Sequence, residues 1–327
     1  MLDSKSSGFA PVSVQVRLPV PIRNLLELWR SSFIMYLIMV QLFVRKVVKK
    51  MLVYKNTYEN IRTINCNFPI EDQFYASDNE AIVADGVTRD PIGIIDFSKC
   101  SHEEFLEKYP RPSGAEIAAR EICDTFSNAS GSLIDKLVKC NENVKKLNGK
   151  YISNCDYLEN DYYSAVASCI KIENNILFYA YICDCGIIVY DKLGNVKFQT
   201  EDDKRLYSDP YINKIGISWD LPEARVIVRR DYRNNLDNIV NGKCVSYGAI
   251  TGEDSAIKFI RTGKVELSEG DIVLLYSDGF YNFLHEKDFI SQILNFREEN
   301  FEKYVEEKSQ NECGKYGGEK TIVLYRF

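Results

Sequence analysis

The sequence predicts an α+β fold in which layered antiparallel β-sheets are flanked by α-helices. Strand-like and helix-like segments occur in separate clusters along the chain, which disfavours the strict alternation of a doubly wound parallel sheet. The chain has 327 residues, 45% of them hydrophobic, enough for a large core in one domain or at most two. We place the folded domain at residues 51–327 and treat residues 1–50 as a separate segment.

Strands are expected where short runs of β-branched and aromatic residues lie between polar segments. The expected strands are Ala81–Ala84, Ala165–Ile172, Ile176–Ile182, Ile187–Tyr190, Arg225–Val228, Ile272–Tyr276 and Thr321–Tyr325. The strands come in clusters, as do the helices between them, and this favours layered antiparallel sheets flanked by helices.

Helices are expected first between residues 113 and 149. Ser113, with Glu116 three residues later, has the spacing of a capping box and predicts a helix N-terminus. A second helix is expected from Ser132 to Leu147, with Asn148 and Gly149 ending it. Two further helices are expected at about Glu286–Phe296 and Glu298–Glu307.

The first fifty residues differ from the rest in composition. They hold eight Lys and Arg against two Asp and Glu, and they contain the apolar run 33–44. Twelve helical residues span ~18 Å, which is less than the ~30 Å of a bilayer core. The segment is therefore a marginal membrane anchor, an interfacial helix, or an upstream extension that is not part of the natural protein. We favour a peripheral or dispensable segment, with any peripheral membrane contact made through residues 25–50.

Charge and cysteine content narrow the function classes. The net charge of the chain is −6, and because residues 1–50 are basic, the remaining residues are more acidic still. An acidic body argues against nucleic-acid binding and is compatible with cation binding. Ten cysteines without a cleavable signal pattern predict reduced thiols and a cytoplasmic location, with or without membrane association. Two histidines make a structural zinc site unexpected.

Acidic residues stand at the ends of several predicted strands. Asp85, Asp184 and Asp278 each follow a strand, and Glu71 and Asp72 precede a short apolar run. A single Asp-Gly pair is usually a turn, but carboxylates repeated at strand ends indicate convergence on one point. Such a cluster is repulsive unless a divalent cation neutralises it, and all-oxygen ligands favour magnesium or manganese.

Five motifs containing these residues resemble, in order and approximate spacing, the metal-dependent protein phosphatases of the 2C type. The motifs are IEDQF, VADGVT, AYICDCGIIVY, GDIVLLYSDGFYNFL and GGEKTIVLY. The resemblance covers roughly Ile61 to Phe327. It implies two antiparallel β-sheets sandwiched between α-helical layers, with a two-metal site at one edge.

The resemblance also implies a metal-binding role for particular residues. Asp85 would bridge two Mn²⁺ or Mg²⁺ ions, and Asp85 and Asp278 would be the catalytic pair. The Gly86 carbonyl and Glu71 would support one ion. Asp278 would hold the other with Glu319, which stands where the family has an aspartate. We expect these four carboxylates to surround a solvent-accessible pocket.

Two further acidic residues receive roles from the same resemblance. Asp72 would lie behind the metal ligands and support them. Asp184 matches an aspartate that contacts a third metal ion in some family members.

The sequence departs from the family pattern at two places. Val87 stands where eukaryotic members have a histidine that protonates the leaving oxygen, and the arginine that precedes the Glu-Asp pair is absent. Arg89, together with Thr88, is expected to bind the substrate phosphate instead, and a solvent-facing loop arginine is an equally good interpretation. A second basic group is expected to be a solvated face: Arg229, Arg230 and Arg233.

The function expected is that of a metal-dependent serine/threonine-type phosphatase. Two metal ions would activate a water that hydrolyses a phosphomonoester, with a phosphoprotein or a small phosphoester as substrate. The alternative is a catalytically weak or inactive phosphatase-like domain that acts as a binding or regulatory module. Asp85 and Asp278 favour the enzyme, while Val87 and Glu319 keep the binding module open. A third interpretation is a membrane-associated signalling component tethered by residues 1–50.

Overall fold

The structure is a computed structural model, and it describes residues 51–62, 70–88, 101–109, 111–218 and 221–327. The predictions made for residues 1–50 and for Arg89 lie outside these residues. Among the described residues, no helix combines the length and the apolar character that a membrane crossing would need.

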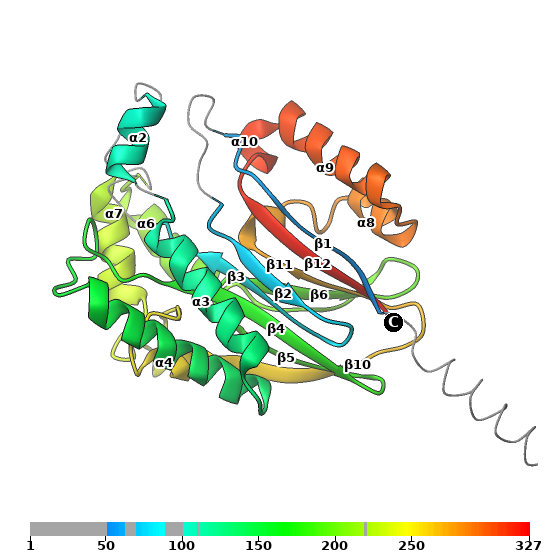
Figure 1. The fold of residues 1–327 in the computed structure, drawn as a ribbon, viewed down its shortest axis with the longest axis horizontal. Helices are drawn as coiled ribbons and strands as arrows, with labels where there is room; N and C mark the ends of the chain where they lie inside the picture. Colours follow the sequence, from blue (N-terminus) through cyan, green and yellow to red (C-terminus); the bar gives the residue numbers. More distant parts are fainter. Residues whose placement is uncertain (1–50, 63–69, 89–100, 110, 219–220) are drawn as a thin grey trace, which may run out of the picture. The chain divides into compact units, whose positions relative to one another are not determined.

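Two five-stranded antiparallel sheets form the centre of the domain (Figure 1). The first sheet has, in spatial order, β1 (Leu52–Tyr58), β12 (Lys320–Arg326), β11 (Ile272–Tyr276), β6 (Gly186–Tyr190) and β7 (Val196–Gln199). The second has β10 (Arg261–Glu266), β5 (Ile176–Ile182), β4 (Ala165–Glu173), β3 (Glu80–Gly86) and β2 (Gln73–Ala76). A separate two-stranded ribbon pairs β8 (Ile239–Val240) with β9 (Lys243–Cys244).

Helices cover the outer face of each sheet. The second sheet is covered by α3 (Gly114–Asn128) and α4 (Leu133–Tyr151), with α2 (His102–Lys108) ahead of them in the chain. The first sheet is covered by α8 (Lys287–Leu294), α9 (Glu298–Asn311) and α10 (Cys313–Tyr316). The order of layers, helix–sheet–sheet–helix, confirms the predicted α+β sandwich.

The segment between β7 and β10, residues 200–260, carries most of the remaining short helices, and we call it the β7–β10 connection. It contains α5 (Asp203–Leu206), α6 (Ser208–Ile215), α7 (Pro222–Ile227), a π-helical turn (Val228–Tyr232) and a 3₁₀ turn (Ala256–Phe259). One more 3₁₀ turn follows β11, at Asp278–Phe280.

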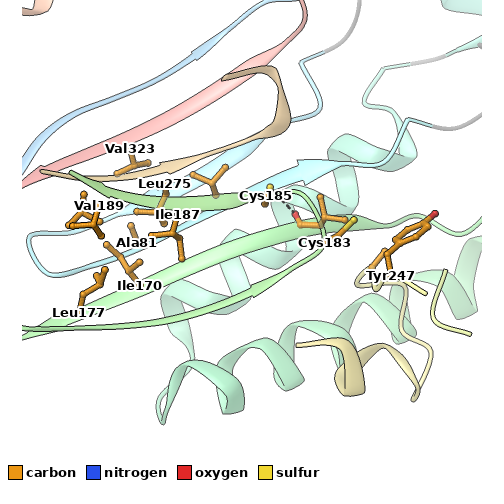
Figure 2. Packing of buried hydrophobic residues seen from close by; sticks show 14 of the residues in the cluster. Ala81, Ile170, Leu177, Cys183, Cys185, Ile187, Val189, Tyr247, Leu275 and Val323 are labelled. Atoms are coloured by element: carbon orange, nitrogen blue, oxygen red, sulfur yellow. Dashed lines mark hydrogen bonds between the residues drawn. The ribbon is translucent and has the colours of Figure 1, made fainter. Parts of the chain in front are cut away.

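Side-chain alternation along the strands divides the core into layers. Val273 and Leu275 of β11 point into the core between the two sheets, whereas Leu274 points to the helices that cover the first sheet. Figure 2 shows the core between the sheets, with Ala81 and Ile170 of the second sheet facing Ile187 of the first. Burial on both faces explains why these strands read as continuous apolar runs.

Six of the seven predicted strands are present, with ends that shift by at most two residues. The predicted strand Arg225–Val228 is wrong, because these residues belong to α7 and the π-helical turn. Pro222 occupies the first turn of α7 and Glu223 lies there too, and both favour a helix start over a strand. The apolar run Val226, Ile227 and Val228 is typical of a strand and gave no indication of the helix.

All four predicted helices are present, with differences at their ends: α8 ends two residues before the predicted Phe296 and α9 continues four residues past Glu307. The Ser113 side chain accepts a hydrogen bond from the Glu116 amide at 3.0 Å, but the Glu116 carboxylate pairs with Arg120 and does not complete the capping box. Helix α4 continues past Asn148 to Tyr151. Asn148 is buried and its side-chain amide donates to the carbonyls of Tyr163 and Thr251, so it anchors the helix and does not end it.

Candidate functional site

The candidate site is a cavity of about 510 Å³ at one end of the two sheets. In an antiparallel sheet the end of one strand lies beside the start of its neighbour. The β2–β3 register therefore sets Asp72 beside Asp85, and the β11–β12 register sets Asp278 near Glu319. Asp184, which follows β5, completes what we call the acidic wall of the cavity: Asp72, Asp85, Asp184, Asp278 and Glu319. The predicted convergence of strand-end carboxylates is thus present for these five residues.

Hydrogen bonds fix part of the acidic wall. Glu319 Oε1 accepts the backbone amides of Glu71 and Asp72, both at 2.7 Å. Ser277 Oγ donates to Asp72 Oδ2 at 2.6 Å and accepts from the Thr321 amide at 2.8 Å. The Glu-Asp pair that precedes β2 in one sheet is therefore tied to the ends of the paired strands β11 and β12 in the other.

Burial and mutual repulsion raise the pKa values of the acidic wall. The pKa of Asp85 lies well above its ordinary value because the group is buried and then because Asp72 and Asp278 are close. Burial raises the pKa of Asp72 to about 7 and, with the charge of Asp72, that of Glu319 to about 9. Without a cation, protons are the available means of removing this negative charge.

Gly86 stands in the cavity wall beside Asp85 at a point where no side chain fits. A Cβ atom there would lie 2.8 Å from the Glu71 carbonyl oxygen and 2.9 Å from the backbone of Ala115. The close approach of three backbone segments explains why glycine follows Asp85.

Glu71 does not line the cavity, in contrast to its predicted place beside a metal ion. Its carboxylate is buried and accepts hydrogen bonds from three hydroxyl groups, those of Thr88 at 2.5 Å, Tyr109 and Ser113. Tyr109 and Ser113 come from the start of the helical layer, so local sequence around the Glu-Asp pair could not indicate them. Thr88, predicted to bind substrate, uses its hydroxyl on Glu71 although it also lines the cavity.

The predicted solvated face of arginines is wrong for two of its three members. Arg229 and Arg233 are buried and line the cavity, while Arg230 is exposed and pairs with Asp231. Arg233 makes two hydrogen bonds to the buried Asp161, at 2.8 and 2.6 Å, and Arg229 Nε lies 3.4 Å from the same carboxylate. We call Asp161, Arg229 and Arg233 the arginine cluster.

The arginine cluster holds the loop that follows Asp85. Arg229 donates one hydrogen bond to the Thr88 carbonyl at 2.8 Å and another to the Tyr157 carbonyl at 3.1 Å. The β7–β10 connection is thereby fixed to the end of β3. The π-helical turn, which the sequence did not reveal, places Arg229 and Arg233 on one side and Arg230 on the other.

Sequence reasoning also missed Arg62, which lines the cavity; burial and then Asp184 raise the pKa of Asp278, and the positive charge of Arg62 is one of those that partly offset this rise. It lies nine residues before Glu71, whereas the family pattern directs attention to the residues just before the pair. Its Nη2 donates to the Lys315 carbonyl at 3.4 Å. Val87, which stands where eukaryotic family members have a histidine, lines the cavity, and His285 is exposed.

The chemical character of the acidic wall suits a hard divalent cation. Its donors are all oxygens, which magnesium and manganese prefer, and its repulsion is relieved by positive charge. In the described part of the chain, however, no three His, Cys, Asp or Glu side chains are already gathered as a metal-binding group. The residues therefore fit the ions by type and charge, and their side chains would have to adjust to coordinate them.

Comparison with known proteins identifies the fold. No family model matches the chain, and no curated protein does. Among solved structures, the Mycobacterium tuberculosis serine/threonine phosphatase PstP/Ppp aligns with a TM-score of 0.51 and 15% identity, over 85% of this chain and 99% of that one. The catalytic domain of PstP in complex with two manganese ions aligns with a TM-score of 0.52 and 16% identity, over 84% and 98%.

A third structure, PppA of Pseudomonas aeruginosa, described as a key regulatory component of T6SS, gives a TM-score of 0.50 at 13% identity, over 84% of this chain and 97% of that one. At these identities the likeness concerns the fold. The fold predicted from the resemblance to 2C-type phosphatases is confirmed, and the chemistry has to be argued from the cavity.

Proposed function

We propose that this chain is a metal-dependent phosphatase that hydrolyses phosphoserine and phosphothreonine in proteins, with small phosphoesters as further substrates. One observation carries the proposal: carboxylates from the ends of separate strands meet in one cavity, in a fold that serine/threonine phosphatases also have. Two Mn²⁺ or Mg²⁺ ions are the proposed cofactors, and the PstP catalytic domain with two manganese ions is a precedent in this fold.

Asp85 is the proposed bridging ligand, because it is buried at the centre of the acidic wall and every carboxylate that raises its pKa lies in that wall. Asp278 and Glu319 would hold one ion and the Gly86 carbonyl would support the other. Bound ions would supply a water of lowered pKa and neutralise the charge of the phosphoryl oxygens. Asp72, fixed by Ser277, would hold this arrangement from behind.

Glu71 takes a different role in this proposal from the one its motif implies. Its three hydroxyl partners make it a support for the loop 86–88 and for the start of α3. Coordination by Glu71 would require breaking these hydrogen bonds, each of which is charge-assisted.

The substrate phosphate needs a cation at the opening of the cavity. Arg62 is one described residue that meets this need, because it lines the cavity, acts on Asp278 and is exposed to solvent. A guanidinium binds two phosphate oxygens at once, which orients the ester for attack. Thr88 and Arg89 stay as further proposed substrate contacts.

The test is hydrolysis of para-nitrophenyl phosphate by the full chain, with manganese and with a chelator. Turnover that requires manganese, together with a manganese-dependent rise in melting temperature, supports the proposal. Wild-type protein with neither property overturns it.

A second candidate is a phosphatase-like binding module. Two observations favour it: the Glu71 carboxylate is buried and hydrogen-bonded to protein hydroxyl groups, and the described residues contain no preformed group of metal-binding side chains. Such a module would bind a phosphopeptide without releasing phosphate. Isothermal titration with a phosphothreonine peptide, followed by a phosphate assay on the same sample, separates the two. A cytoplasmic location and peripheral membrane contact through residues 25–50 stay predictions.

A further inference from the structure

Lys204 reaches into the acidic wall from the β7–β10 connection. It lies on α5, and its Nζ is 3.6 Å from Asp184 Oδ2. Both residues line the cavity. The pair therefore joins the turn after β5 to the connection that covers this end of the sheets.

The surroundings of Lys204 keep it charged. Its ammonium lies beside the Asp184 carboxylate, and the other carboxylates of the acidic wall line the same cavity. Among the described residues of the cavity, Lys204 is the cation that forms an ion pair with a carboxylate of the acidic wall.

The neighbouring cation, Arg205, has other partners. Its Nε lies 2.8 Å from Asp202 Oδ2, and its guanidinium stacks on the Tyr281 ring at 3.8 Å. Arg229 and Arg233 share Asp161. These three arginines line the same cavity, and these ion pairs lie outside the acidic wall.

We propose that Lys204 is a resident counter-ion of the acidic wall: its ammonium occupies Asp184 and thereby keeps a metal ion off that carboxylate. The inference rests on the proposed function, since it requires metal binding in this cavity. In this proposal Asp184, which was predicted to bind a metal ion, pairs with Lys204 instead. The carboxylates that bind metal are then those of Asp85, Asp278 and Glu319.

The physical reason is competition between cations for one carboxylate. A divalent ion at Asp184 would lie within a few ångströms of the ammonium, and like charges at that distance repel strongly in a partly buried site. With Lys204 in place, Asp184 is already neutralised. Without Lys204, the negative charge of Asp184 is uncompensated and adds to the repulsion among the carboxylates of the acidic wall.

The test compares metal binding by the full chain and by Lys204→Met, without substrate. Isothermal titration should give one additional manganese per chain in the variant, or a dissociation constant about tenfold lower. The metal-free variant should melt at a lower temperature than wild type, while its manganese-induced shift in melting temperature should be larger. A lysine that only tethers α5 to the turn after β5 would lower the melting temperature and leave the manganese shift unchanged.

Three variants sharpen the comparison. Lys204→Arg keeps the charge and should bind manganese as wild type does. Arg205→Met removes a charge from the same helix and cavity, and an effect on manganese as large as that of Lys204→Met would overturn the assignment. Asp184→Asn in the Lys204→Met background should remove the added metal binding. Lys204→Gln replaces Lys204→Met if the latter fails to fold.

The outcomes separate the inference from the function on which it rests. If wild type binds manganese and Lys204→Met binds it with the same stoichiometry and affinity, the inference is wrong and the proposed phosphatase stands. If neither protein binds manganese and wild type hydrolyses no phosphoester, both are wrong. If only the variant binds manganese, the lysine is a counter-ion that displaces the metal, and the phosphatase proposal fails.

Discussion

Two groups of buried charge meet at the same cavity: in the arginine cluster the carboxylate is paired with two cations, whereas in the acidic wall most of the carboxylates face one another. In the arginine cluster, burial raises the pKa of Asp161, but Arg233 and then Arg229 outweigh burial and hold it below its ordinary value. In the acidic wall, burial and like charges act in the same direction, and the pKa values of Asp72, Asp85, Asp278 and Glu319 all rise.

The comparison shows that burial alone does not decide the state of a carboxylate. Asp161 and Asp72 are both almost completely buried, yet their pKa values move in opposite directions because their nearest charges have opposite signs. In the arginine cluster, folding alone provides the carboxylate with its cations. The acidic wall is completed by protons or by added cations, which is the property expected of a metal site.

The comparison is tested most severely by Asp85→Asn, which removes the central charge of the acidic wall. We expect manganese-dependent hydrolysis to fall by more than about 100-fold, since the loss of residues that merely support metal ligands already costs 10–100-fold. The manganese-induced rise in melting temperature should disappear. The metal-free variant should melt no lower than wild type, because an amide of the same shape relieves repulsion. A variant that keeps its manganese shift would remove Asp85 from the metal site.

Asp161→Asn tests the opposite group. It leaves two buried arginines without their carboxylate, and breaking a buried ion pair in this way costs about 3–5 kcal/mol. Urea unfolding should record this as a lower midpoint with an unchanged slope. An unfolding free energy within about 1 kcal/mol of wild type would mean that Asp161 is not what compensates the arginines.

The pH dependence of stability should differ in sign between the two groups. Raised pKa values mean that the folded state binds more protons, so the metal-free protein should lose stability as pH rises, from 3.8 to about 7 for Asp72 and from 4.5 to about 9 for Glu319. Each group contributes at most about 1.4 kcal/mol per pH unit. Asp161, with a lowered pKa, contributes stability that is lost as pH falls below 3.8.

Melting temperatures measured from pH 5 to pH 9 in a chelator check this prediction, and the same series in saturating manganese is its control. Manganese should flatten or reverse the loss, because the bound cation favours ionised carboxylates. A metal-free protein whose stability rises steadily over this range would contradict the description of the acidic wall.

The smallest effect is expected for Arg230→Met. Arg230 adjoins Arg229 in sequence, but it is exposed and its ion pair with Asp231 lies in solvent. Exposed pairs contribute about 0–1 kcal/mol, so unfolding free energy and hydrolysis should stay close to wild type. A large loss in either would show that position along the π-helical turn, rather than burial, decides which arginine matters.

Sequence predicted the β-strands best where both faces are buried. Ile272–Tyr276 has the predicted bounds because a strand buried on both faces is apolar throughout. Ile176–Ile182, which is only partly buried in its first half, also has the predicted bounds because it too is apolar throughout and turns mark its ends. Strand β1, at the edge of its sheet, mixes polar and apolar residues and was not predicted. The strand expected at Arg225–Val228 is absent because a helix begins at Pro222.

The acidic wall could be predicted because its residues directly adjoin strands, and antiparallel pairing brings strand ends together. The partners that decide each residue's role could not. Glu71 is sealed by Tyr109 and Ser113, and Asp184 is paired with Lys204, through contacts between segments far apart in the sequence. Whether an acidic motif residue faces the cavity or another protein group depends on these tertiary contacts.

The pairing of β1 with β12 also constrains how the chain folds during synthesis. β1 is the first described strand of the domain, and its partner in the first sheet is the last, so their contact joins residues 52 and 325. Pairings of this sequence separation form slowly, and an edge strand without its partner is open to association with other chains. Because Glu319 immediately precedes β12, the acidic wall also remains incomplete until the segment that contains Glu319 and β12 has left the ribosome. A nascent chain that stops before Glu319 therefore carries neither a closed first sheet nor a finished cavity.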